Sequence, residues 1–218
     1  HLPPYLCDPA EPHRGHYDNL GQPDRTWLLQ LLSLHRVERL FAGHVHFAFC
    51  DRLGSLQYTI VPSTSFTRPG FGHLFTSAPA PEQGRDDAPK LGFYLCRVFD
   101  KRSDLHLIRT AGETNFTATQ LITRTPAALQ GAALALTLTH PLCPTAEVPL
   151  AWPSVIRQRV RNDYPLLAVQ EIGATSVRVP WTDIEDTLQR ERLQYLRAEG
   201  IAVQAFVPFD DALDLHHL

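Results

Sequence analysis

The feature that most constrains the fold is a short segment, Val37–Ala42, that ends on Gly43 and is followed by His44, Val45 and His46. The segment predicts a short buried strand that delivers two imidazoles at its carboxyl end. Alternate residues of a strand share a face, so the two histidines converge if the strand geometry continues, whereas the glycine also permits a sharp turn. Neutral imidazole is the commonest side-chain ligand of transition metals. A metal site is therefore the first hypothesis, and two unrelated polar histidines are the alternative.

The composition excludes several classes of protein. The chain has 218 residues, of which 44% are hydrophobic and 20% charged, with a formal net charge of -3. That is enough for one large or two small globular domains, and the mild acidity argues against non-specific nucleic-acid binding. The sequence predicts neither a membrane-spanning segment nor a signal peptide.

The cysteines and the methionine content bear on the compartment and on the extent of the chain. The four cysteines are widely spaced and form no C-x-x-C, which favours a reducing cytoplasm. The chain begins at His1 and contains no methionine, so we expect it to be a piece of a longer protein.

The residues before the segment predict a long surface loop followed by a helix. Residues 1–22 are rich in proline, glycine and histidine and have no helical or alternating period. Pro23 and Asp24 suit the first turn of a helix, which we expect to end near His35. Four apolar residues at helical spacing predict its buried face: Trp27, Leu28, Leu31 and Leu32.

The rest of the chain predicts an α/β organisation in two parts. Strands are expected at 47–50 and 56–61, and then in a hairpin formed by 92–99 and 105–109. Residues 111–125 are polar and predict a linker, and residues 126–218 predict the start of a second, barrel-like α/β domain. There, strands at 132–139, 175–179 and 201–207 accompany a helix that stops at Gly200, a pattern typical of a parallel βαβ unit.

Two blocks of the first part resemble a known family. His1-Leu2-Pro3-Pro4, followed by a loop, a helix, a strand and Gly43-His44-Val45-His46, resembles the carboxyl-terminal half of the calcineurin-like metallophosphoesterases. The family's blocks, in order, are D-x-H, G-D-x-x, G-N-H-[D/E], a lone H and G-H-x-H, of which the last two are present here. The resemblance covers residues 1–110 and implies a partial layered α/β sandwich.

The resemblance also implies a function and a set of ligands. His1 matches the lone histidine and His44 the first histidine of G-H-x-H, and both would bind the second metal of a dinuclear site. His46 would bind the first metal. The metals would be two divalent transition ions, Mn, Fe or Zn, in the parent protein, and one or none in this chain alone. The parent would be a hydrolase acting on a small-molecule phosphoester.

Three further residues are candidates for function, each with a structural alternative. His16 lies in the loop after His1 and would line the mouth of the site, or is a solvated loop residue. Arg68 follows a strand expected near the two histidines and would clamp a phosphate, or is a surface residue. Asp183 would serve a barrel enzyme at the carboxyl end of a strand, or cap the following helix, a role it shares with Thr182.

Two other functions compete with hydrolysis. The chain could be a non-catalytic remnant that keeps the phosphoesterase scaffold for regulation or binding, and upstream sequence without the first three blocks would favour this reading. Alternatively, residues 1–110 could be an accessory domain of a barrel enzyme. Neither membranes nor nucleic acids are expected partners in any of the three cases.

Overall fold

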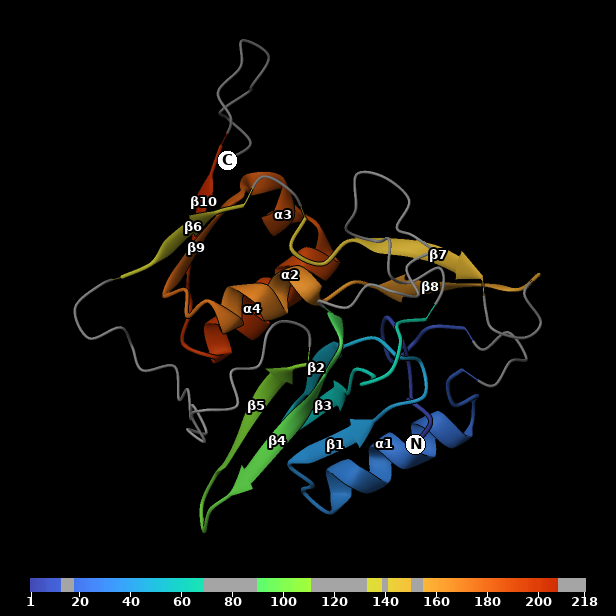
Figure 1. The fold of residues 1–218 in the computed structure, drawn as a ribbon. Coiled ribbons are helices and arrows are strands. Elements are labelled where there is room, and N and C mark those ends of the chain that lie inside the picture. The colour runs from blue at the N-terminus through green and yellow to red at the C-terminus, as the bar shows by residue number, and fades with distance from the viewer. Residues whose placement is uncertain (13–17, 69–89, 111–132, 139–140, 150–154, 208–218) are drawn as a thin grey trace. The chain divides into compact units, whose positions relative to one another are not determined.

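The computed structural model describes residues 1–12, 18–68, 90–110, 133–138, 141–149 and 155–207 (Figure 1). These residues form a mixed α/β protein with four helices and several small sheets. The chain divides into two compact units: His1–Thr125 with Pro144–Tyr164, and Pro126–Cys143 with Pro165–Leu218. The division groups residues 111–125, expected as a linker, with the first unit. Residues 144–164, expected at the start of the second domain, return to the first unit, where the Arg161 amide donates to the Leu6 carbonyl at 3.2 Å.

A three-stranded sheet carries the first unit. Its strands are β1 (Arg39–Ala42), β2 (Phe49–Leu53) and β3 (Leu56–Ile60). β3 lies in the centre, parallel to β1 and antiparallel to β2. β2 begins two residues later than expected and runs on to Leu53, so the turn to β3 is short and Gly54 takes a left-handed φ of 61°. The β1 strand of this sheet ends at Ala42, and Gly43 then leads into the two histidines.

The core of this unit is aromatic. Tyr5, Phe49 and Tyr58 are fully buried, and their ring centroids lie 5.0 to 5.9 Å apart. Tyr5 comes from the irregular segment after His1, and the two other rings come from β2 and β3. The aromatic cluster thus anchors the loop that carries His1 onto the sheet that carries His44 and His46.

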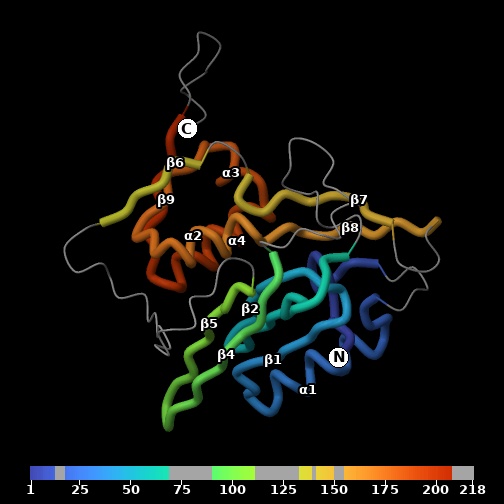
Figure 2. Tube along the Cα trace, viewed as in Figure 1, coloured from blue at the N-terminus to red at the C-terminus, as the bar shows by residue number. Residues whose placement is uncertain are grey.

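Two hairpins complete the first unit, as the trace in Figure 2 shows. The expected hairpin is present as β4 (Gly92–Val98) and β5 (Ser103–Arg109), paired antiparallel. The second hairpin pairs β7 (Thr145–Pro149) with β8 (Arg157–Arg161) and was not expected from the sequence. Its last residue, Arg161, is 1% exposed, and its guanidinium lies 4.1 Å over the Phe49 ring.

The helix of the first unit, α1 (Asp24–Leu34), has the expected bounds. Of its predicted buried face, Leu28, Leu31 and Leu32 are half-buried, whereas Trp27 is 62% exposed. The buried residue of the helix is Arg25, with no exposed surface. The Arg25 guanidinium donates to the carbonyls of Pro9, Glu11 and Leu20. An arginine that satisfies several loop carbonyls can be buried at a position where hydrophobic periodicity places a surface residue.

The second unit contains a parallel sheet in the order β10-β9-β6. Its strands are β6 (Ala135–Thr137), β9 (Ser176–Pro180) and β10 (Ala202–Phe206). Its helices are α2 (Tyr164–Glu171), whose first residue belongs to the first unit, α3 (Trp181–Glu185) and α4 (Thr187–Ala198). The predicted parallel βαβ pairing of β9 and β10 is confirmed, and the helix stops at Gly200, where φ is 87°.

The predicted cap of this helix is wrong. The helix is divided at Asp186, which caps α4 by accepting from the Gln189 amide at 2.8 Å. α3 begins after Pro180 without a side-chain cap, so neither Thr182 nor Asp183 has the predicted role. Among the described residues, no helix is long and apolar enough to cross a bilayer.

Candidate metal centre

The two histidines lie in a tight turn, Gly43–His46, that follows β1 and is called the histidine turn below. The Gly43 amide donates to the His1 carbonyl, and the Val45 amide donates to the Gly43 carbonyl, both at 2.9 Å. The chain therefore turns at the glycine, and the strand geometry that would place both imidazoles on one face does not continue.

Both histidines have a left-handed backbone. The φ angle is 74° at His44 and 55° at His46, and the intervening Val45 is fully buried. Non-glycine residues seldom adopt positive φ, and such strain persists only where the surroundings fix the conformation. Strained residues of this kind gather at ligand and catalytic sites. The backbone of the histidine turn is thus held in a conformation that the sequence would not adopt by itself.

His1 and His44 meet edge to face. Their ring centroids are 5.2 Å apart with an interplanar angle of 81°. The Gly43 backbone lies against the His1 ring, where an added Cβ would come 3.8 Å from two ring atoms. The structure therefore brings together the two residues predicted to bind the same metal, although they are 43 positions apart in the sequence.

His46 lies against a different neighbour. Its ring stacks edge to face on Phe66, with centroids 4.5 Å apart. Burial lowers the pKa of His46, and the nearby Arg68 guanidinium lowers it further, while a hydrogen bond with the Phe66 backbone opposes the shift. Burial also lowers the pKa of His44. Both imidazoles are therefore neutral near pH 7, which is the form that binds metals.

The donor set of these residues suits a metal only in part. Neutral imidazoles fit Mn, Fe or Zn, but the described residues contain no group of three His, Cys, Asp or Glu side chains placed to hold an ion. His1 and His44 supply one side of a site, and the carboxylate ligands expected from the family would have to come from elsewhere.

Asp18 and Arg68 form a buried pair beside His44. The two terminal nitrogens of Arg68 donate to the two carboxylate oxygens of Asp18 at 2.9 and 2.8 Å. Asp18 Oδ1 also lies 3.7 Å from His44 Nε2. A bidentate arginine fixes a carboxylate in one orientation, so Asp18 presents a fixed negative charge to the His44 ring.

This pair changes the interpretation of Arg68. The sequence predicts that its guanidinium clamps a phosphate, but both terminal nitrogens bind Asp18 and the residue is 8% exposed. A substrate phosphate would therefore compete with Asp18 for the guanidinium. His16, the other residue predicted to contact substrate, lies outside the described residues.

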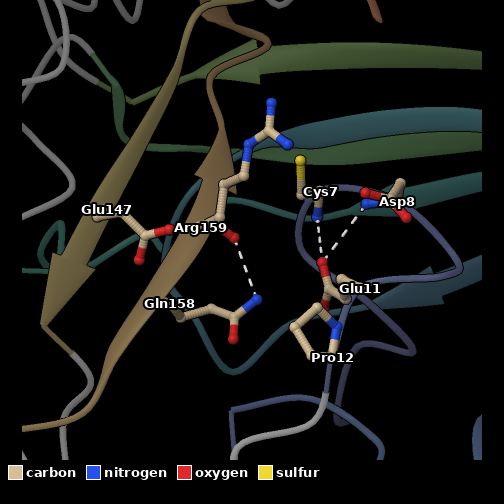
Figure 3. Close-up of a pocket in the computed structure, with 7 residues that line it drawn as sticks. All are labelled: Cys7, Asp8, Glu11, Pro12, Glu147, Gln158 and Arg159. Carbon is tan, nitrogen blue, oxygen red and sulfur yellow. Dashed lines mark hydrogen bonds between the residues drawn. The ribbon is translucent and has the colours of Figure 1, made fainter.

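A separate pocket of about 110 Å³ lies in the first unit between the loop after His1 and the β7–β8 hairpin (Figure 3). Its lining includes Cys7, Glu11 and Arg159. The Glu11 carboxylate accepts from the amides of Leu6 and Cys7, so it serves the loop. Burial raises the pKa of the Cys7 thiol to about 11, which keeps it protonated at neutral pH. The pocket therefore contains no activated nucleophile.

In the second unit, Asp183 is a buried carboxyl group with one oxygen left unsatisfied by the described residues. It is 6% exposed, and its Oδ2 has no hydrogen-bond partner in the described part of the chain. Burial raises the pKa of Asp183, and the neighbouring charge of Asp186 raises it further. The residue follows the carboxyl end of β9, the edge of a parallel sheet where ligands usually bind.

We expect Asp183→Asn to stabilise the protein by about 1 kcal/mol at pH 7, because it removes a buried charge that has no partner. The folded-state pKa lies above the unfolded value of 3.8, so the unfolded state loses its proton first as the pH rises. The gain should therefore be present at neutral pH and disappear as the pH falls toward 3.8. Urea unfolding at several pH values would measure it, with Asp186→Ala, which removes the cap of α4, expected to destabilise by about 1 kcal/mol instead.

Sequence reasoning missed two contributors to the site. One is Asp18, whose pairing with Arg68 spans 50 positions and leaves no local signal. Asp163 and Tyr164 hold the backbone that leaves the histidine turn, but the sequence placed them in another domain. The signal available in the sequence was the polar run Arg161-Asn162-Asp163-Tyr164. The structure buries all four residues, and buried polar groups are usually paired.

Comparisons with protein-family models, with curated proteins and with solved structures find no match to this chain.

Proposed function

We propose that this chain supplies the histidine side of a dinuclear metal site in a phosphoester hydrolase. The observation that carries the proposal is the meeting of His1 and His44 beside a strained turn, since two histidines 43 positions apart are brought into ring contact. His1 and His44 would hold the second metal and His46 the first.

Residues around the histidines would orient the metal-binding imidazoles and keep a negative charge beside them. Two divalent ions, Mn, Fe or Zn, supply Lewis acidity and a hydroxide nucleophile at neutral pH when bound at such a site. The carboxylate of Asp18, fixed by Arg68, would orient the His44 imidazole and make it a stronger donor. Arg68 lies in the same cluster and could contact a substrate phosphate only by exchanging its bonds to Asp18.

The test is metal content and aryl-phosphate hydrolysis by a chain extended upstream to include the D-x-H, G-D-x-x and G-N-H-[D/E] blocks. We expect His46→Ala to lower both metal content and rate, the rate by about 100-fold or more. His35→Ala is the matched control, because His35 is an exposed residue at the end of α1. If His46→Ala leaves both quantities unchanged, the proposal fails. Metal binding without turnover would instead support a regulatory or binding role.

A second candidate function lies in the second unit, and the unpaired buried carboxyl group of Asp183 favours it. Buried carboxyl groups with a raised pKa at the edge of a parallel sheet serve as acids or bases in many enzymes. In this case residues 1–110 would be accessory. Activity would then survive replacement of His44 and His46 but be lost in Asp183→Asn, although that variant is expected to be more stable.

A further inference from the structure

The backbone that leaves the histidine turn is held by side chains from more than 100 positions downstream. The Ala48 amide donates to the Tyr164 hydroxyl oxygen at 3.1 Å. The Cys50 amide donates to Asp163 Oδ2 at 3.0 Å. Ala48 is fully buried and Cys50 is 4% exposed, so these two amides are out of reach of bulk water. Asp163 and Tyr164 therefore satisfy the two amides at the start of β2.

The two acceptors are themselves fixed. Asp163 receives two hydrogen bonds from the Arg161 guanidinium, at 2.8 and 3.0 Å, and has no exposed surface. The Tyr164 amide donates to the Asn162 side chain at 3.1 Å. The run Arg161–Tyr164, called the buttress below, is thus a rigid polar element in the first unit.

The histidine turn is held at both ends. Upstream, the Gly43 amide binds the His1 carbonyl, and the Val61 amide binds the Ala42 carbonyl at 2.8 Å. Downstream, two residues after His46, the Ala48 amide donates to the Tyr164 hydroxyl oxygen. A positive φ at two non-glycine residues persists only if both ends of the turn are fixed.

We propose that the buttress is a positioning element for the histidine turn, and that Tyr164 and Asp163 set the orientation in which His44 and His46 meet a metal. The metal readout of this inference rests on the proposed function. The buttress acts through the backbone, at the Ala48 and Cys50 amides. A chain cut at the expected domain boundary, residue 110, would lack both side chains.

The test compares two variants that each lose one hydroxyl group of the first unit. Tyr164→Phe removes the acceptor of the Ala48 amide, whereas Ser103→Ala removes an acceptor of the Arg39 guanidinium, at the opposite end of β1 from the turn. Zn²⁺ alone is the probe, titrated into the full chain. We expect Tyr164→Phe to weaken Zn²⁺ binding by about tenfold, and Ser103→Ala to change it by less than about twofold. Equal effects of the two variants would show a general loss of stability and overturn the inference.

A second readout needs no metal. In chain labelled at histidine, Tyr164→Phe should shift the ring resonances of His44 and His46 and leave those of His35, on the exposed end of α1, in place. Unchanged resonances would overturn the inference whatever the Zn²⁺ result. If the wild-type chain binds no Zn²⁺ but the resonances shift, the proposed function loses its support and the positioning role remains.

Discussion

Replacing Arg161 with methionine should lower the free energy of unfolding by about 3–5 kcal/mol, because it removes one partner of a buried ion pair. The guanidinium donates to the carbonyls of Cys7 and Cys50, at 2.7 and 2.9 Å, and to the Asp163 carboxylate. It also lies 3.6 Å from Asp51 Oδ2. Methionine fills a similar volume but leaves two buried carboxylates without a cation and two carbonyls without a donor. That loss is a large part of the stability of an ordinary domain.

Arg157→Met is the matched control for this prediction. Arg157 lies on the same strand, β8, and its guanidinium donates to the Glu147 carbonyl from an exposed position. We expect it to change the free energy of unfolding by less than about 0.5 kcal/mol. Urea denaturation of both variants measures the difference. Comparable losses would mean that Arg161 stabilises the hairpin alone and not the packing of residues 144–164 onto the first unit.

Arg25→Met should cost about 3 kcal/mol and also loosen the loop that begins at His1. Arg25 has no exposed surface and donates to the carbonyls of Pro9, Glu11 and Leu20. Its guanidinium also lies 3.9 Å from the Glu11 carboxylate. Without it, three carbonyls lose their donor and a buried carboxylate loses its cation. Chemical denaturation measures the stability, and proteolysis of the first 20 residues should accelerate.

Arg36→Met is the control for Arg25. Arg36 follows the same helix, is exposed and already has a positive φ of 52°, which methionine would share. The variant should be as stable as the wild type within about 0.5 kcal/mol. If Arg25→Met were equally harmless, the buried arginine would not organise the loop, and α1 would have to be held by its apolar residues.

The sequence predicts local elements well where the signal is local. Proline and aspartate at positions 23 and 24 mark the start of α1, and the charged turn between β4 and β5 marks that hairpin. The parallel pairing of β9 and β10 follows from a strand, a helix and a strand in succession. Each of these features is set by residues that lie in one element or in two consecutive elements of the chain.

The sequence fails where a charged residue is buried by distant partners. Arg25 and Arg161 belong to a residue type that hydrophobic patterns place on the surface, and each is buried because carbonyls and carboxylates from other segments satisfy it. Arg25 is more buried than the half-buried leucines of α1, and Arg161 lies within residues 144–164, which belong to the first unit. Partners 111 and 154 positions away leave no local signal.

The candidate site divides in the same way. The histidine turn follows from a strand that ends on a glycine, and His1 enters by its resemblance to a family block. The pairing of Asp18 with Arg68 and the contacts of Asp163 and Tyr164 join residues that only the fold brings together. The sequence therefore predicts the ligands and misses the residues that hold them.

The most direct test of the histidine assignment is X-ray absorption at the zinc edge of the zinc-loaded chain, extended upstream as for the hydrolysis test. The account predicts imidazole nitrogen ligands at about 2.0–2.1 Å, with fewer of them in His44→Ala and the same number in His35→Ala. A wild-type chain that binds no zinc, or a spectrum that is identical in His44→Ala, would contradict it.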